Sequence, residues 1–129
     1  MGVGIPFGIG AKAAAPDKPV VVLSGDGAFG WNGMEMDTAI RHKLNIVVVL
    51  SNNAGFTSRK TGGNVGRDLG YQRYDKLVEA LGGYGEFVEK PDEIRPAIER
   101  AMKAGKPALV NVCTDPDAQA TTDMGFAGY

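Results

Sequence analysis

The chain has 129 residues, a net charge of −1 at pH 7, and a composition that is 43% hydrophobic and 22% charged. This length predicts one domain, over residues 1–129, with a sizeable core. The near-zero charge argues against nucleic-acid binding, and no apolar run reaches the ~20 residues of a membrane span. The single cysteine and the lack of a recognisable leader predict a cytoplasmic protein.

The first segment, residues 2–15, is built of small and apolar residues, including glycines at positions 2, 4, 8 and 10. Glycine is a poor helix former, so propensity alone leaves this segment unassigned. Pro16 and Asp17 then predict a turn ahead of the first strand.

Two apolar runs, residues 20–23 and 46–50, predict strands. Residues 31–42 between them predict a helix with Asn32 as its N-cap. This order is a βαβ unit, and its right-handed crossover makes the two strands parallel. Polar turns follow both strands. Because parallel strands end at the same edge, where open α/β sheets bind ligands, Asp26 and Asn53 should face one small volume.

The groups at this edge suit a hard divalent cation. Asp26 offers a carboxylate, Asn53 an amide oxygen and Gly55 a backbone carbonyl. Such donors favour Mg²⁺ or Ca²⁺ over zinc, and Mg²⁺ usually completes its shell with phosphate oxygens and water. The glycines at positions 25 and 27 let backbone N–H groups approach a phosphate. Each turn alone is more typical of ordinary structure, but the pair predicts a diphosphate bridged by a cation.

Three other reactive side chains have ordinary interpretations. Glu35 and Asp37 are two residues apart, which places them on different sides of a helix and favours solvated charges over a catalytic pair. His42 at the predicted helix end is typical of a surface residue. Cys113 in an apolar strand is typical of a small buried residue.

Residues 54–71 form a long, polar, glycine-rich stretch of a kind that is often functional. Its basic residues Arg59, Lys60 and Arg67 either reach an anionic substrate, such as a coenzyme A phosphate, or form a basic surface loop. Residues 114–129 form a polar tail, which is either a lid or disordered.

The remaining elements alternate between helix and strand. Residues 74–81 predict an amphipathic helix with Leu77 buried and Asp75 exposed. Residues 84–88 and 107–113 predict strands, and helical spacing between them, after Pro91, predicts a second helix. The whole predicts an α/β fold, a three-layer sandwich around a mostly parallel sheet of four or five strands.

The Gly25-Asp26-Gly27 and Asn52-Asn53 turns, each after an apolar strand, resemble the diphosphate-binding motif of thiamine diphosphate enzymes. Residues 27–46 and 106–112 are most similar to the oxalyl-CoA decarboxylase and 2-hydroxyacyl-CoA lyase branch, with acetolactate synthase also similar. The resemblance implies a thiamine diphosphate-binding fold, a helix over residues 2–15, and a role as the pyrophosphate-binding, C-terminal domain of a larger enzyme.

The resemblance also implies a site. Mg²⁺ would be ligated by Asp26, Asn53 and the carbonyl of Gly55, and thiamine diphosphate would lie against Gly27 and Ala28. The implied cofactor-binding set is Met1, Gly25, Asp26, Gly27, Ala28, Asn53, Gly55 and Phe56. Met1 either matches a bulky residue beneath the cofactor in relatives or is only the start of the chain.

The implied activity is a C–C bond lyase or decarboxylase acting on 2-hydroxyacyl-CoA or oxalyl-CoA, or else an acetolactate synthase-like carboligase acting on a 2-oxo acid. Family catalysis needs a glutamate from a pyrimidine-binding domain, which nothing in this sequence matches. We therefore expect no catalytic residue in this chain and an inactive isolated domain. It would be a fragment, a subunit of a split enzyme, or a non-catalytic assembly domain, within a homo-oligomer of the full enzyme.

Overall fold

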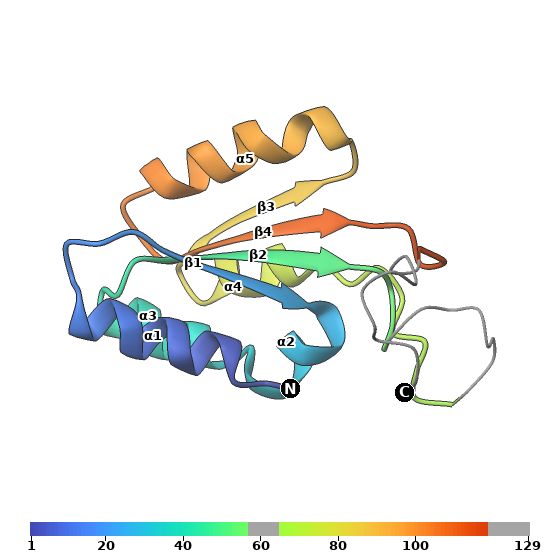
Figure 1. The fold of residues 1–129 in the computed structure, drawn as a ribbon, viewed down its shortest axis with the longest axis horizontal. Coiled ribbons are helices and arrows are strands. Elements are labelled where there is room, and N and C mark those ends of the chain that lie inside the picture. Colours follow the sequence, from blue (N-terminus) through green and yellow to red (C-terminus); the bar gives the residue numbers. More distant parts are fainter. Residues whose placement is uncertain (57–64, 119–129) are drawn as a thin grey trace, which may run out of the picture.

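The computed structural model describes residues 1–56 and 65–118, and its core is one parallel sheet of four strands (Figure 1). The strands lie in the order β1-β2-β4-β3. Their bounds are β1 Val20–Gly25, β2 Ile46–Asn52, β3 Tyr84–Val88 and β4 Ala108–Cys113. All three pairings are parallel, as the βαβ pattern predicted.

Helices cover both faces of this sheet, which confirms the three-layer arrangement. Of the helices in the described ranges, α5 covers one face and the other four cover the opposite face (Figure 1). Their bounds are α1 Gly4–Ala14, α2 Asp26–Asn32, α3 Glu35–Arg41, α4 Tyr74–Ala80 and α5 Pro91–Lys103. None of the described helices is long and apolar enough to cross a membrane.

Alternate residues of the two central strands, β2 and β4, contribute to two separate cores, one on each face of the sheet. On the four-helix face, Met36 of α3 and Val78 of α4 pack with Val48 of β2 and are fully buried. On the other face, Ala97 of α5 packs against Val110 of β4. This alternation is the period-2 geometry of strands covered on both faces.

The single crossover helix predicted over residues 31–42 is wrong. Helix α2 begins earlier, at Asp26, and the chain breaks at Gly33 before α3 begins. A side chain at Gly33 would collide with the Phe29 ring, so a glycine lets this ring lie against the junction between α2 and α3. Asn32 is the last residue of α2 rather than an N-cap, and its Nδ2 donates to the Gly2 carbonyl at 2.9 Å.

The ordinary interpretation of the acidic residues in α3 is supported. Glu35 Oε2 accepts a hydrogen bond from Thr38, and Asp37 forms an ion pair with Arg41 at 2.6 Å. Each carboxylate therefore has its own partner on the helix surface. His42 is exposed at the end of α3.

Helix α4 differs from its predicted amphipathic pattern in one important respect. Asp75, predicted to face solvent, is 1% exposed, whereas Leu77, predicted to be buried, is 37% exposed. The helix is therefore turned so that a carboxylate enters the interior. Hydrogen-bonding partners from other elements surround this carboxylate, and periodicity alone cannot show them.

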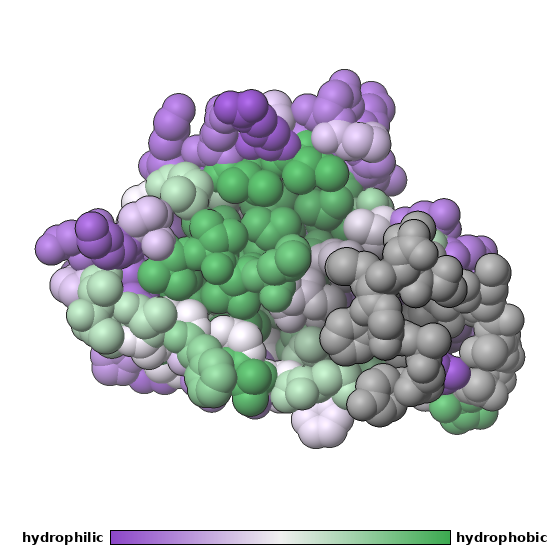
Figure 2. Space-filling view, in the orientation of Figure 1, coloured by the Kyte–Doolittle hydropathy of each residue, from purple (hydrophilic) through white to green (hydrophobic). Residues whose placement is uncertain are grey.

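The α5 face leaves β1 partly uncovered. Val21 and Leu23 are 53% and 77% exposed, and Figure 2 shows apolar residues gathered over β1 between α5 and α1. A groove of about 930 Å³ runs from Val21 along Ile94, Ile98 and Met102 of α5. Exposed apolar patches of this kind are typical of surfaces that pack against another protein or domain.

We predict that Leu23→Lys reduces concentration-dependent association of the 129-residue chain while changing the free energy of unfolding by less than about 0.5 kcal/mol, since the side chain is exposed. Sedimentation velocity and urea unfolding measure the two effects. Ala13→Lys, which adds the same charge at an exposed position of α1, is the control. Equal association of all three proteins would contradict an adhesive β1 face.

Candidate functional site: the carboxyl edge of β1 and β2

Asp26 lies at the junction where β1 ends and α2 begins. Gly25 is in an extended conformation, so the chain passes from strand to helix without an intervening loop. The Asp26 side chain is 1% exposed, and its Oδ1 accepts the Gly27 backbone N–H at 2.9 Å. Its Oδ2 has no hydrogen-bond partner within the described part of the chain.

The charge state of Asp26 reflects a balance between burial and backbone dipoles. Burial raises the pKa of this carboxyl above its ordinary value, and nearby backbone N–H groups of Gly27, Gly55 and Ala54 oppose part of that rise. Leaving an ionised oxygen buried without a partner is costly. A cation beside Oδ2 would offset that cost.

The turn after β2 lies beside this carboxylate. Parallel pairing sets Gly25 of β1 opposite Ser51 of β2, so both strands end together. The backbone of Ala54 and Gly55 then comes close enough to Asp26 to lower its pKa. The structure thus brings the two predicted turns together. The ligand roles of Asn53 and Gly55 remain predictions.

This turn is held in an uncommon conformation. Ala54 has φ = 63°, in the left-handed region, where a residue with a Cβ pays about 1–2 kcal/mol. Its N–H donates to Asn52 Oδ1 at 3.2 Å, and its carbonyl accepts from Leu69 at 2.9 Å and from Gly70 at 3.2 Å. The turn is therefore fixed from both sides.

Two glycines in the site allow close approach by other groups. A Cβ on Gly55 would lie 2.6 Å from the Arg67 carbonyl oxygen, and the neighbouring Phe56 N–H donates to that same oxygen at 2.9 Å. A Cβ on Gly27 would lie 2.5 Å from the ring of Phe56. Phe56 therefore packs directly on the start of α2. Its predicted place near the cofactor stays a prediction.

A pocket of about 330 Å³ opens next to these residues. It is lined by Gly27, Gly30, Trp31, Phe56, Leu69 and Tyr74. Burial, together with the charge of Asp26, raises the pKa of Tyr74. The Tyr74 ring packs against Phe29 with ring centroids 5.1 Å apart. The pocket thus offers apolar walls next to a buried carboxylate, and sequence reasoning did not anticipate Tyr74 in it.

The other predicted site residues are less informative. Ala28 follows Gly27 in α2 and is half-buried. Met1 is 82% exposed at the chain end, where the Asn32 bond to Gly2 holds the segment near α2. Of the basic residues, Arg59 and Lys60 lie outside the described residues, as do residues 119–129 of the tail.

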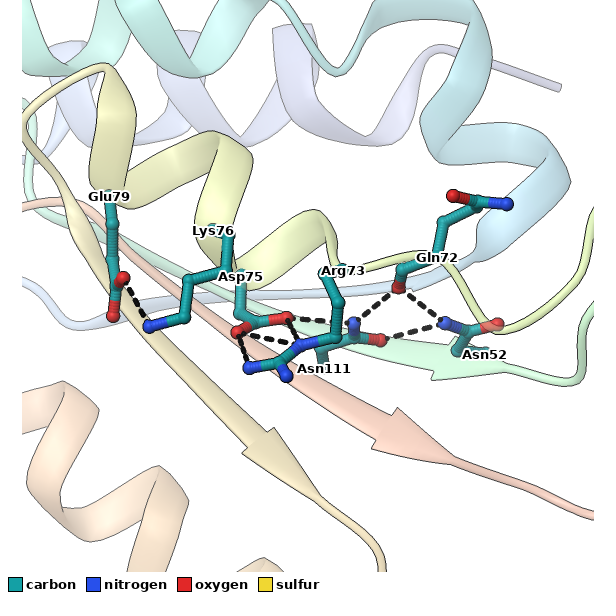
Figure 3. A network of polar contacts seen from close by, with 7 residues as sticks. All are labelled: Asn52, Gln72, Arg73, Asp75, Lys76, Glu79 and Asn111. Carbon is teal, nitrogen blue, oxygen red and sulfur yellow. Dashed lines mark hydrogen bonds and ion pairs between the residues drawn. The ribbon is translucent and has the colours of Figure 1, made fainter.

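A buried polar network behind the turn was also missed by the sequence reasoning (Figure 3). Asn52 and Asn111 are both fully buried, and both donate to the Gln72 carbonyl. Asn52 also donates to Asn111, which donates to Asp75. Burial alone would raise the pKa of Asp75, but hydrogen bonds from Arg73 and Asn111 outweigh it and lower the pKa. An asparagine within the apolar β4 run was the signal that could have revealed it.

The donors at this edge fit Mg²⁺ and a diphosphate. Within residues 1–56 and 65–118, no three His, Cys, Asp or Glu side chains gather into a metal site. A cation here therefore depends on one carboxylate plus neutral oxygens, which leaves coordination positions for phosphate and water, as Mg²⁺ prefers. The buried Oδ2 of Asp26, to which no described residue donates a hydrogen bond, suits the role of charged ligand.

Comparison with known proteins gives the same assignment. The sequence profile described as "Thiamine pyrophosphate enzyme, C-terminal TPP binding domain" matches residues 1–112. The chain therefore belongs to the thiamine pyrophosphate enzyme family, as its C-terminal cofactor-binding domain.

Among relatives, a probable acetolactate synthase of Mycobacterium bovis is 47% identical over 90% of this chain and 22% of its own length. A 2-hydroxyacyl-CoA lyase of Arabidopsis thaliana is 38% identical over 93% of this chain and 23% of its own. The oxalyl-CoA decarboxylase of Escherichia coli is 38% identical over 92% of this chain and 22% of its own length. The expected branch is thus represented, while the synthase shares more identical residues.

The solved structure of a thiamine diphosphate-dependent 4-hydroxybenzoylformate decarboxylase from Rhodococcus jostii RHA1 superposes with a TM-score of 0.82. It is 28% identical and covers 93% of this chain and 24% of its own. The chain therefore spans less than a quarter of the proteins it matches, and the fold expected from the resemblance is confirmed.

We predict that Gly27→Ala lowers the free energy of unfolding by about 1–3 kcal/mol, because its Cβ displaces the Phe56 ring. Gly30→Ala, in the same helix but with open space around its Cβ, should instead raise it by about 0.5–1 kcal/mol. Urea unfolding of both variants measures the difference. Equal effects would mean that Phe56 does not pack on Gly27.

Proposed function

We propose that this domain binds thiamine diphosphate through Mg²⁺ within a larger C–C bond lyase or decarboxylase. The observation that carries the proposal is the buried Oδ2 of Asp26, which has no hydrogen-bond partner among the described residues and lies next to the turn that follows β2. A buried carboxylate arranged in this way suits a cation better than it suits a structural ion pair.

The chain's own residues have distinct tasks in this proposal. Asp26, Asn53 and the Gly55 carbonyl would hold the cation, and the backbone beside Gly27 and Ala28 would approach the diphosphate at the start of α2. When bound, thiamine diphosphate supplies the electron sink for breaking or making a C–C bond beside a carbonyl. Phe56 and Tyr74 line the adjacent pocket and give it apolar walls.

The favoured substrate class is a 2-hydroxyacyl-CoA or oxalyl-CoA, as for the lyase and decarboxylase relatives. A second candidate is a carboligase on 2-oxo acids, which the 47% identity to acetolactate synthases supports. Assaying the full-length enzyme with both substrate classes distinguishes them: acyl-CoA cleavage without acetolactate formation supports the first, and the reverse supports the second.

The proposed partner is a pyrimidine-binding domain, which would supply the activating glutamate. The relatives are more than four times as long as the matched region, and the apolar groove along β1 gives this domain an adhesive surface. We also propose that the full enzyme is a homo-oligomer. Turnover only when the pyrimidine-binding domain is present would support it, and turnover by the isolated chain would contradict it.

We predict that Asp26→Asn in the full-length enzyme weakens Mg²⁺-dependent thiamine diphosphate binding by more than about 100-fold, since changes outside the ligand shell alone cost roughly 10- to 100-fold. The same change should not lower the free energy of unfolding in the absence of cations, because it removes a buried charge that no described side chain compensates. Isothermal titration calorimetry and urea unfolding with a chelator measure the two effects.

Asp37→Asn, at a surface carboxylate paired with Arg41, is the matched control and should bind as the unchanged enzyme does. Undiminished cofactor affinity in Asp26→Asn would overturn the proposed function. A binding loss accompanied by unfolding would show that Asp26 has a structural role instead.

A further inference from the structure

A second buried carboxylate lies behind the proposed cation site, and the site does not use it. Asp75 is 1% exposed at the start of α4 and is paired with Arg73 at 2.6 Å. The guanidinium of Arg73 in turn lies 4.3 Å from the centre of the Phe87 ring. Arg73 and Phe87 thus hold Asp75 as a fixed, ionised acceptor inside the domain.

A continuous series of hydrogen bonds leads from Asp75 to the turn (Figure 3). Asn111 Nδ2 donates to Asp75 Oδ1 at 3.2 Å, and Asn52 Nδ2 donates to Asn111 Oδ1 at 3.0 Å. Both amides also donate to the Gln72 carbonyl, at 2.9 and 3.1 Å. Asn52 Oδ1 then accepts the Ala54 N–H at 3.2 Å.

The orientation of the two amides is set by groups that only accept hydrogen bonds. A carboxylate only accepts hydrogen bonds, so it requires the Nδ2 side of Asn111 to face it. Asn111 Oδ1 is then turned toward Asn52, which must present its own Nδ2 in return. That leaves Asn52 Oδ1 for the Ala54 N–H. The Gln72 carbonyl, which also only accepts, favours the same orientation, so Asp75 and Gln72 together set the orientation of both amides.

The series ends at Ala54, whose backbone conformation is unfavourable and needs stabilising contacts. Ala54 is held with a positive φ, and it lies between Asn53 and Gly55, the proposed neutral cation ligands. We propose that Asp75 is a positioning residue that, through Asn111 and Asn52, holds the turn at residues 52–55 in its cation-binding conformation. This role rests on the proposed function of the domain. Asp75 itself does not contact the cation or the cofactor.

Asp75→Asn tests this in the full-length enzyme. An asparagine would have one amide oxygen for the Arg73 and Asn111 donors in place of a carboxylate, and its own Nδ2 donor would face one of them. The Asp75 end of the series would therefore be weakened, while the Gln72 carbonyl would still accept from both amides. The expected results are Mg²⁺–thiamine diphosphate binding weakened by about tenfold and faster hydrogen exchange at the Ala54 amide in the cation-free protein. Asn111→Leu, which removes the link but keeps buried volume in β4, should do the same.

The matched control is Glu86→Gln. Glu86 also forms a carboxylate–arginine pair, at 2.7 Å with Arg100, but it lies on β3, at the edge of the sheet opposite β1. Its loss should leave cation affinity and Ala54 exchange unchanged. A merely structural role for Asp75 would make the two variants behave alike.

The outcomes separate this inference from the proposed function. If the unchanged enzyme binds no Mg²⁺–thiamine diphosphate, the proposed function fails, and this positioning role fails with it. If it binds and neither Asp75→Asn nor Asn111→Leu alters affinity or Ala54 exchange, only the positioning role is overturned. If one variant fails to fold, the other decides, and non-additive losses in the double variant confirm that both act on one series.

Discussion

The site depends on the parallel pairing of β1 with β2. The register that sets Gly25 opposite Ser51 makes both strands end at the same level. From that point β1 continues directly into α2, and β2 continues into the turn that contains Asn53. Since a parallel pair cannot shift by one residue without moving apolar side chains to the wrong face, the packing of the two cores also fixes the distance between the two turns.

The second constraint is the cost of the buried carboxylates. Asp75 is compensated within the domain, by Arg73 and Asn111. Asp26 is compensated only in part, by backbone N–H groups. A fold under selection for stability alone would pair or remove such a group, and uncompensated charge in a concave site is typical of binding sites. Asp75 therefore belongs to the scaffold of the domain, and Asp26 belongs to the candidate site.

Sequence patterns predicted the strands and the convergence of their ends well. Apolar runs predicted β1 and β2, and the polar turn residues after each strand predicted the edge of the sheet where ligands would lie. The break between α2 and α3 could not be predicted, because the sequence pattern does not show the contact between Phe29 and Gly33 at this junction. The burial of Asp75 was missed for a similar reason: its partner Asn111 comes from β4, far along the chain, and helical periodicity carries no information about it.

The same limit applies to the surface of the domain. Residues 20–23 predicted an apolar strand, but the pattern could not show that Leu23 is largely exposed, with no described helix covering that side of β1. Parallel sheets are normally covered on both faces, and the relatives are more than four times longer than the region they share with this chain. The uncovered strand is consistent with a domain that functions inside a larger enzyme.

The most direct test of this account is a crystal structure of the full-length enzyme with thiamine diphosphate and Mn²⁺ in place of Mg²⁺, with the cation located by its anomalous scattering. We expect one cation at roughly 2.1 Å from Asp26 Oδ2, the Asn53 side-chain oxygen and the Gly55 carbonyl oxygen, with diphosphate oxygens completing its shell. A cofactor whose cation lies away from Asp26 would contradict it.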